Sequence, residues 1–429
     1  MKRRWMTPLF FVLLAVIVIG CTRETAKTTK PPWDYDNPVQ TTSGAFTYHA
    51  YVSGDEDECW IYQIDVNTEE GDAATLSIPS EIDGIAVTHI GFVEVSNDTG
   101  SIQNIFGNVV DSDNGKDGYA KTLKGIRSIF IPDSVTDIER ACFSGLRYLR
   151  SVEIPDNVRR LRSESFYGCR RLRTVKLPAK LAEFRADAFN GCTALKTLSI
   201  SSDNEAFEIA DNCMLLTKQE QELVFVTAGK RKLEIPEGVT GIATVAFTIS
   251  RARSVQIPST VQSIGSRALE NEHIRDIRIA DDNDSFAISG QCIYAKNDNR
   301  LVVAIPNTNG YLRISNRITK LDSTFSIAGG TVKVVIFSRN LEEVSGSGLN
   351  FDRDGALKRV YFTGTNPPEI SNEPDDGSAL PIAAVYVPKN TEDKYREWYE
   401  DHDSYDLVAN WDTYNQNQLK RAEDRANAL

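Results

Sequence analysis

The sequence predicts a solenoid, in which short repeated coils stack on one another through a ladder of parallel strands. Two adjacent stretches, 149–171 and 172–194, match position by position at a spacing of 23 residues. Leu149 falls on Leu172, and each stretch carries a Gly-Cys pair near its end. A fixed period of roughly 20–50 residues is typical of stacked repeats, and one such unit cannot bury its own apolar positions. Neighbouring coils must therefore cover one another.

A pattern of apolar residues identifies further copies of this unit. An aliphatic or aromatic residue is followed by apolar residues 4, 7 and 12 positions later. These copies begin at Ile131, Ile154, Leu177, Ile235, Ile257 and Phe337. In the first five a proline comes next, and proline closes a strand because it has no N–H to donate to a ladder. Each unit is predicted as a strand, a turn, a second extended piece and a helical or irregular turn, which makes the fold class an α/β-repeat solenoid.

Two copies are longer in the same way. Ile200 and Ile235 are 35 residues apart, as are Ile279 and Ile314. Within these stretches Cys213 falls on the position of Cys292. This recurrence indicates a defined variant, which we predict to be a hairpin added to one coil.

The N-terminus has the pattern of a targeting segment. Three basic residues, 2–4, precede an apolar run, Leu9–Ile19, that is too short to span a bilayer comfortably. The run ends in Val-Ile-Gly-Cys at 18–21, which resembles a bacterial lipobox. Two interpretations are open, lipid attachment at Cys21 or a plain secretory signal. We expect the first, because the cysteine falls directly at the end of the apolar run and acyl chains would anchor the protein stably.

Composition divides the chain into six segments. Residues 22–44 are rich in Thr and Pro, as flexible tethers are, whereas residues 45–91 alternate apolar and polar residues like antiparallel strands. The last segment is polar, and we expect poor order there apart from a helix from about Asn415. The predicted segments are a lipoprotein signal peptide (1–20), a flexible tether (21–44), an N-terminal β cap with a first irregular repeat (45–122), the solenoid (123–364), a C-terminal cap (365–400) and a polar tail (401–429).

The repeats resemble the BspA-like class of bacterial leucine-rich repeats, whose pattern is roughly LxxLxLPxxLxxIxxxAFxxC. The lipobox, the 35-residue variants and the C-terminal pattern of Pro367-Pro368, Val387-Pro388, Tyr395 and Trp398 are also similar to that group. The resemblance covers about residues 45–400. It implies a surface lipoprotein of the Bacteroides type, with leucine-rich repeats between two caps, that binds host or matrix proteins or glycans and has no catalytic site.

Charge and residue usage weigh against several functional classes. The formal charge of the 429 residues is −12, which argues against a nucleic-acid partner. None of the seven cysteines forms a CxxC pair, so we expect neither a zinc site nor a thioredoxin-type motif. The four histidines, at 49, 89, 273 and 402, lie in separate modules without a recurring catalytic pattern. We therefore expect no enzyme activity and no cofactor.

Two smaller motifs each leave an alternative open. Cys169 and Cys192 occupy the same position in adjacent coils, which stack at roughly 4.8 Å, close enough for a disulfide. We favour buried thiols that act as small apolar side chains. The acidic loop 111–117 has the ligand spacing of a calcium loop but lacks the closing Glu, since Thr122 stands there, so we favour a solvated turn over a metal site.

The strand ladder also predicts a binding surface, because residues that flank the buried ones point outward. The candidate binding face comprises Phe130, Glu153, Lys176, Arg278, Arg313, Ile336, Arg359 and Tyr361. Four apolar residues, Phe130, Val334, Ile336 and Tyr361, fall at these outward positions. They indicate either a contact surface or residues covered by capping elements.

A basic run interrupts the acidic background. Between Glu139 and Arg185 the sequence holds twelve Lys or Arg and five Asp or Glu. The candidate basic patch is Arg147, Arg150, Arg170, Arg173 and Lys196, whose copies stack although like charges repel. It is either a face that attracts an acidic partner, such as a sulfated glycan or an acidic protein patch, or a solvated face.

These observations predict a non-catalytic lipoprotein of the cell envelope, anchored by lipid in the outer membrane and exposed at the surface. It would bind an extracellular protein or glycan through the repeat face. One alternative is a glycan-capture lipoprotein that serves an uptake system. The other is a hydrolase, against which the low histidine count and the absence of paired carboxylates outside repeat positions argue.

Overall fold

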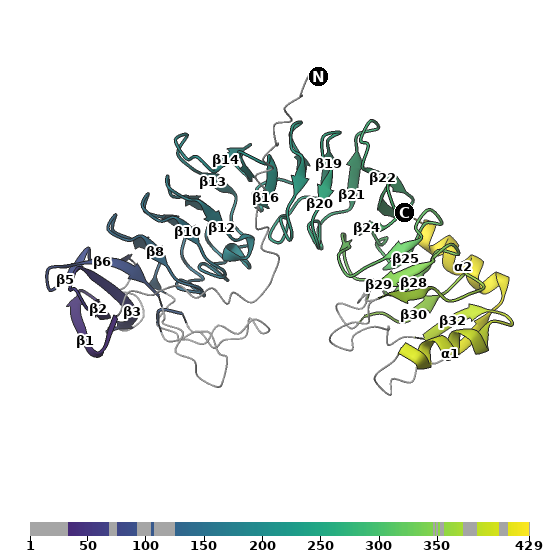
Figure 1. Cartoon of the computed structure of the whole chain (residues 1–429), viewed down its shortest axis with the longest axis horizontal. Coiled ribbons are helices and arrows are strands. Elements are labelled where there is room, and N and C mark those ends of the chain that lie inside the picture. The colour runs from purple at the N-terminus through teal and green to yellow at the C-terminus, as the bar shows by residue number, and fades with distance from the viewer. Residues whose placement is uncertain are drawn as a thin grey trace, which may run out of the picture. The chain divides into compact units, whose positions relative to one another are not determined.

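The computed structural model describes residues 33–67, 75–91, 104–106, 125–345, 348, 351, 356–371, 384–402 and 411–428. All of them belong to the unit Pro32–Leu429. The predicted signal peptide, Cys21 and the acidic loop 111–117 lie outside the described residues. Strands and turns dominate, and the strands follow one another in chain order (Figure 1).

Parallel strands form the predicted ladder in three successive sheets. Thr174 pairs with Ser151 on one side and with Thr197 on the other, so equivalent residues of successive coils lie side by side. The first sheet contains β4 (Thr75–Ser77), β7 (Ser128–Phe130), β9 (Ser151–Glu153), β11 (Thr174–Lys176) and β13 (Thr197–Ser199). The second contains β17 (Lys232–Glu234), β19 (Ser254–Ile257) and β21 (Asp276–Ile279). The third contains β25 (Tyr311–Arg313), β28 (Val334–Ile336), β30 (Arg359–Tyr361), β32 (Ala384–Pro388) and β33 (Trp411–Tyr414).

The second extended piece of each coil forms shorter ladders of its own. Leu161, for example, pairs with Ile138 and Phe184 of the neighbouring coils. The strands are β8 (Asp137–Ile138), β10 (Arg160–Leu161) and β12 (Glu183–Phe184), then β18 (Gly241–Ile242) and β20 (Ser263–Ile264), then β26 (Lys320–Leu321), β29 (Glu343–Ser345) and β31 (Glu369–Ser371). The solenoid of parallel strands is therefore confirmed.

Helix is scarce in this solenoid. The named helical elements within the described residues are η2 (Ala186–Phe189), α1 (Glu392–His402) and α2 (Gln416–Asn427). Within the described residues, most of the turns that could have been helical are irregular. The molecule is accordingly a β-solenoid, and the expected α/β label overstates its helix content.

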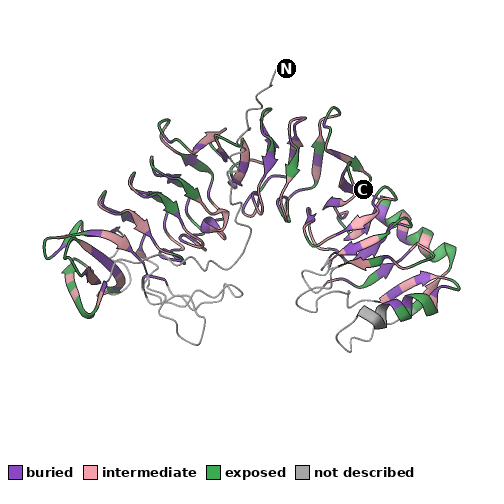
Figure 2. Ribbon diagram, viewed as in Figure 1, coloured by how far each residue is buried: buried purple, intermediate pink, exposed green. Residues whose placement is uncertain are grey.

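The core runs between the ladders and is built from equivalent residues of successive coils. Phe143, Phe166 and Phe189 are fully buried and stack, with ring centroids 5.4 and 5.6 Å apart. Leu149 and Leu172, the residues that define the period, are also fully buried. Along the strands, burial alternates with exposure, as a one-sided ladder requires (Figure 2).

The two 35-residue variants contain the predicted hairpin, extended by a third strand. In each, two antiparallel pairs are formed and the last strand then pairs in parallel with the next coil. The first insert consists of β14 (Phe207–Ala210), β15 (Met214–Thr217) and β16 (Glu222–Val226), and the second of β22 (Phe286–Ser289), β23 (Cys292–Ala295) and β24 (Leu301–Ala304), which pairs with β27 (Ser326–Ile327).

One buried asparagine organises each insert. The Asn204 amide nitrogen donates to the carbonyls of Ala179 and Leu181, both at 2.9 Å, while its side-chain oxygen accepts from the backbone N–H of Phe207 at 2.6 Å. Asn283 makes the equivalent bonds in the second insert, at 2.9 Å to Val261 and 2.7 Å from Phe286. The repeated Asp-Asn of the sequence is thus a structural device that ties the insert to the preceding coil.

The N-terminal cap includes part of the expected tether. β1 (Trp33–Ser43) pairs antiparallel with β2 (Phe46–Ser53), β2 pairs with β3 (Glu58–Val66), and β3 joins β6 (Ile85–Ile90) in parallel. β5 (Glu81–Ile82) completes the cap beside β6. Trp33 is 5% exposed and its ring lies 5.4 Å from that of Trp60. Residues 33–43 are therefore a strand held by this indole packing, and not a tether.

The C-terminal segment is more ordered than its polarity indicated. The predicted helix forms as α2, and Asn415 caps it through a capping box with Gln418. Ala422 and Ala426 of α2 pack in one apolar cluster with Val334, Ile336 and Tyr361. The segment from Trp411 onward thus contributes the last ladder strand and a covering helix.

Candidate binding face

The outward residues of the first sheet line up as the repeat predicts. Lys176 lies between Glu153 and Ser199 in the ladder and forms an ion pair with Glu153. Phe130 stands opposite Ser77 and is 60% exposed. This part of the candidate face is open, and its side chains are polar apart from one phenylalanine.

The second sheet contributes a separate, charged part. Arg278 stands beside Gln256 in the ladder and is exposed, and its Nε lies 3.1 Å from a carboxylate oxygen of Asp276 on the same strand. The first insert lies between the first and second sheets in the chain order. The candidate residues therefore belong to different sheets and do not meet in one site.

The third sheet overturns part of the candidate face. Ile336 is 1% exposed and Tyr361 is 6% exposed. Val334 is buried as well. The sequence places these residues outward from the ladder, and they do point outward, but α2 and neighbouring tyrosines cover them. Of the two interpretations offered for the apolar residues, cover by a capping element is right for these three.

Polar contacts fasten α2 over this sheet. Arg313, expected on the face, forms an ion pair with Glu423 of α2 at 3.1 Å. The Asn307 amide donates to the carbonyls of Arg425 at 2.6 Å and Ala428 at 3.0 Å, which satisfies carbonyls that the end of a helix leaves open. Arg359 remains exposed. On this sheet, most of the face is thus occupied by the chain's own C-terminus.

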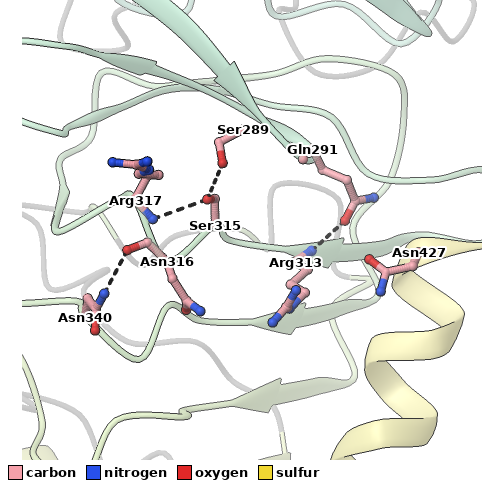
Figure 3. Close-up of a pocket in the computed structure, with 9 residues that line it drawn as sticks. Ser289, Gln291, Arg313, Ser315, Asn316, Arg317, Asn340 and Asn427 are labelled. Atoms are coloured by element: carbon pink, nitrogen blue, oxygen red, sulfur yellow. Dashed lines mark hydrogen bonds between the residues drawn. The ribbon is translucent and has the colours of Figure 1, made fainter.

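A polar pocket of about 500 Å³ lies where α2 ends beside the second insert (Figure 3). Ser289 and Ser315 share a hydrogen bond of 2.6 Å, and the Gln291 side-chain oxygen accepts from the Arg313 backbone N–H at 2.7 Å. The lining residues are Ser289, Gly290, Gln291, Arg313, Ser315, Asn316, Arg317, Asn340 and Asn427. Hydroxyls, amides and guanidinium groups suit hydrogen bonding to a hydroxyl-rich ligand.

Three of the five residues of the basic patch, Arg150, Arg173 and Lys196, occupy equivalent positions in neighbouring coils. The Arg173 backbone N–H donates to the Arg150 carbonyl at 2.8 Å, and that of Lys196 donates to Arg173 at 2.9 Å. All three side chains are exposed. Arg147 and Arg170 lie in a different column, two residues after the glycine of their turns. The patch therefore flanks the ladder strands, with its two columns on the preceding turn.

Sequence reasoning missed the full extent of this column. The residue directly before the strand is also basic in coils outside 149–195, at Arg127, Arg231, Arg253, Arg275, Lys333 and Lys358. Writing all ladder strands one above the other would have found it. The inserts conceal the register because they change the spacing between the sheets.

The cysteines that the structure describes are thiols. All six described cysteines are free and buried, which confirms the favoured interpretation of Cys169 and Cys192. Their sulfurs donate to the carbonyls of Phe143 at 3.4 Å and Phe166 at 3.1 Å, respectively. Burial raises the pKa of the Cys192 thiol well above its ordinary value. A thiol of this kind is inert as a nucleophile.

Two of the histidines pair with carboxylates near the N-terminal end of the solenoid. His49 lies 2.8 Å from Asp65, and His89 lies 3.5 Å from Asp137, both within or beside the N-terminal cap. Within the residues described here, no group of three or more His, Cys, Asp or Glu side chains could hold a metal ion.

Comparisons with known proteins give one family match. Residues 116–225 and 218–318 match the model of the BspA type Leucine rich repeat region, in six copies. A search of curated proteins gave no match.

Solved structures with similar folds come from several bacteria. A leucine rich cell surface protein of Faecalibacterium prausnitzii is 18% identical, with 87% of this chain and 100% of that chain covered and a TM-score of 0.37. The pneumococcal vaccine antigen PcpA is 14% identical, with 88% and 98% covered and a TM-score of 0.39. A leucine-rich repeat protein of Bacteroides ovatus is 13% identical, with 89% and 100% covered and a TM-score of 0.32.

No helix within the described residues is both long and apolar enough to cross a membrane.

Proposed function

Since the chain belongs to the BspA-type leucine-rich-repeat family of bacterial surface proteins, we propose that it is a lipid-anchored surface protein that binds an extracellular protein or glycan without catalysis. The first ladder sheet is the proposed contact surface. Its strands β9, β11 and β13 bury their middle residue and expose the residues on both sides. This regular, exposed strand face is the observation that carries the proposal.

The third sheet supports the same proposal by contrast. There the outward residues Val334, Ile336 and Tyr361 are apolar and α2 covers them. On β9, β11 and β13 the outward residues are polar or charged. Such residues are soluble in the free protein and can form the polar contacts of an interface with a partner. The first sheet is thus the part of the ladder best suited to contact another molecule.

The polar pocket favours a second candidate, capture of glycans for a neighbouring uptake system. Its amides and hydroxyls would hydrogen-bond to sugar hydroxyls, whereas it has no acid–base pair of the kind that hydrolysis needs. Both candidates are binding functions, and they differ in ligand class.

An array experiment tests the binding proposal. The full chain, purified in detergent, is applied to arrays of matrix proteins and glycans. We expect saturable binding to at least one class. Hits restricted to neutral oligosaccharides, abolished by Asn316→Ala with Asn340→Ala, would favour glycan capture through the pocket. Turnover of a substrate, or no binding to either class, would contradict the proposal.

Anchoring is tested at the cysteine itself. We expect Cys21→Ala to move the protein from the membrane fraction to the soluble fraction, because acyl chains would supply the attachment. Thr22→Ala is the control and should stay with the membrane. The measurement is fractionation of cells followed by immunoblotting, and a Cys21→Ala protein that remains in the membrane would refute lipid attachment at this residue.

A further inference from the structure

The residue directly before the ladder strand is basic in nine of the ten coils from β7 to β30. Gly310, before β25, is the exception. We call the nine residues the cationic ridge: Arg127, Arg150, Arg173, Lys196, Arg231, Arg253, Arg275, Lys333 and Lys358. The strands themselves vary in charge at their outward positions, so the regularity belongs to this one position of the repeat.

Backbone hydrogen bonds keep successive members of the ridge level with each other. Besides the bonds that link Arg150, Arg173 and Lys196, the N–H of Arg150 donates to the Arg127 carbonyl at 3.0 Å. The second sheet repeats this, since the N–H of Arg275 donates to the Arg253 carbonyl at 2.8 Å. Adjacent parallel strands lie about 4.8 Å apart, so the cations of one sheet recur at that interval. The ridge therefore consists of runs of four, three and two cations.

All nine residues are exposed, and none of them forms an ion pair with another residue of the described chain. Elsewhere in the same coils, basic residues are paired, as Arg160 is with Glu183 and Lys176 with Glu153. Like charges that stack in neighbouring strands repel. The chain has a formal charge of −12, yet no carboxylate of the residues that the structure describes forms an ion pair with the ridge.

We propose that the cationic ridge binds a linear polyanionic glycan, a sugar chain bearing carboxylate or sulfate groups, along the run from Arg127 to Lys196. This proposal deepens the proposed binding function and rests on it. The ridge extends by translation from coil to coil, and a linear polymer repeats in the same way. Its anionic groups would meet successive cations, and the release of bound counterions would favour the complex.

The neighbouring residues fit this ligand class. A row of hydroxyls stands directly beside the run, at Ser128, Ser151, Thr174 and Thr197, where they can hydrogen-bond to sugar and sulfate oxygens. An acidic protein partner would instead be expected to meet clustered aromatic anchors. Phe130 is the one large exposed apolar side chain on the strands of this sheet that the structure describes.

A matched pair of double variants tests the ridge. The full chain in detergent is titrated with heparin as the sulfated probe, with neutral dextran as the blank. We expect Arg150→Ser with Arg173→Ser to weaken binding about two- to thirtyfold, the range of two exposed ion pairs. The dependence of affinity on salt should also become shallower. The control, Arg159→Ser with Arg160→Ser, removes the same charge from the β10 side of the coils and should retain most of the affinity.

Several outcomes would overturn the ridge as a glycan site. These are equal losses in the two double variants, binding to heparin that does not respond to salt, or equal affinity for duplex DNA. Arg150→Lys with Arg173→Lys keeps the charge and should keep most of the binding, while circular dichroism confirms that every variant is folded. A matrix-protein hit that the ridge variants leave unchanged would contradict the ridge and leave the proposed binding function standing.

Discussion

Asn204 and Asn283 are the residues on which the two inserts depend. Each side chain is almost fully buried and uses both its amide nitrogen and its oxygen on backbone groups. The backbone carbonyl of Asn204 also accepts a hydrogen bond from the Lys218 ammonium at 2.6 Å, and that of Asn283 accepts one from Lys296 at the same distance. A buried side chain that satisfies several backbone groups cannot be replaced without leaving some of them unpaired.

We expect Asn204→Ala to lower the free energy of unfolding by about 3 kcal/mol, because each buried group left without a partner costs about 1–3 kcal/mol. The control is Asn297→Ala, at an exposed turn position, which should change it by less than about 0.5 kcal/mol. Urea unfolding followed by circular dichroism measures both. If both substitutions changed the free energy of unfolding equally, the hydrogen bonds of Asn204 would not contribute to stability.

The apolar repeat pattern predicts the buried positions and the strand register, but not the neighbours of every outward residue. Phe130 and Ile336 occupy the same position of the repeat, and one is 60% exposed while the other is 1% exposed. The difference comes from α2, which is distant in sequence from both residues and packs over the third sheet. Local periodicity carries no information about such a contact. In the same way, the Thr- and Pro-rich composition of residues 22–44 does not predict that Trp33 packs on Trp60.

At the scale of elements, α2 depends on small buried residues. Ala426 is 3% exposed and packs in the cluster that contains Ile336 and Tyr361. We expect Ala426→Lys to detach α2, because a lysine there would be buried without a partner charge. Ala428→Lys, at an exposed position near the same helix end, is the control.

Limited proteolysis provides the measurement. Trypsin should cleave the Ala426→Lys protein within 416–427 faster than the control by roughly tenfold, the factor that about 1.4 kcal/mol of lost docking energy would produce. Binding of a dye specific for exposed apolar surface should rise as well, since Val334, Ile336 and Tyr361 would lose their cover. A helix that stays protected in both variants would show that the apolar cluster does not hold it.

At the scale of the whole molecule, the described coils contact mainly their neighbours, so stability should be transmitted locally. The stack of Phe143, Phe166 and Phe189 belongs to one apolar cluster, whereas Phe325, Phe337 and Phe351 belong to another. A defect in the first cluster should therefore loosen nearby coils before distant ones.

We expect Phe166→Ala to cost about 3–5 kcal/mol in unfolding free energy, as the loss of a buried aromatic ring does. Hydrogen exchange should accelerate most in residues 125–199 and least in 311–361. Phe130→Ala, at an exposed site of the same sheet, is the matched control and should leave both measurements nearly unchanged. Uniform acceleration along the chain would contradict local transmission.

The buried thiols bear on how the solenoid is assembled. Cys169 and Cys192 stack in adjacent coils and donate to backbone carbonyls instead of joining, so the described fold contains no covalent cross-link. The described residues would therefore fold without the help of thiol-oxidising enzymes. A reducing agent should leave the thermal unfolding midpoint unchanged, whereas a drop of several degrees, as calorimetry would detect, would reveal a bridge. The stack can thus form equally well in cells that live without oxygen.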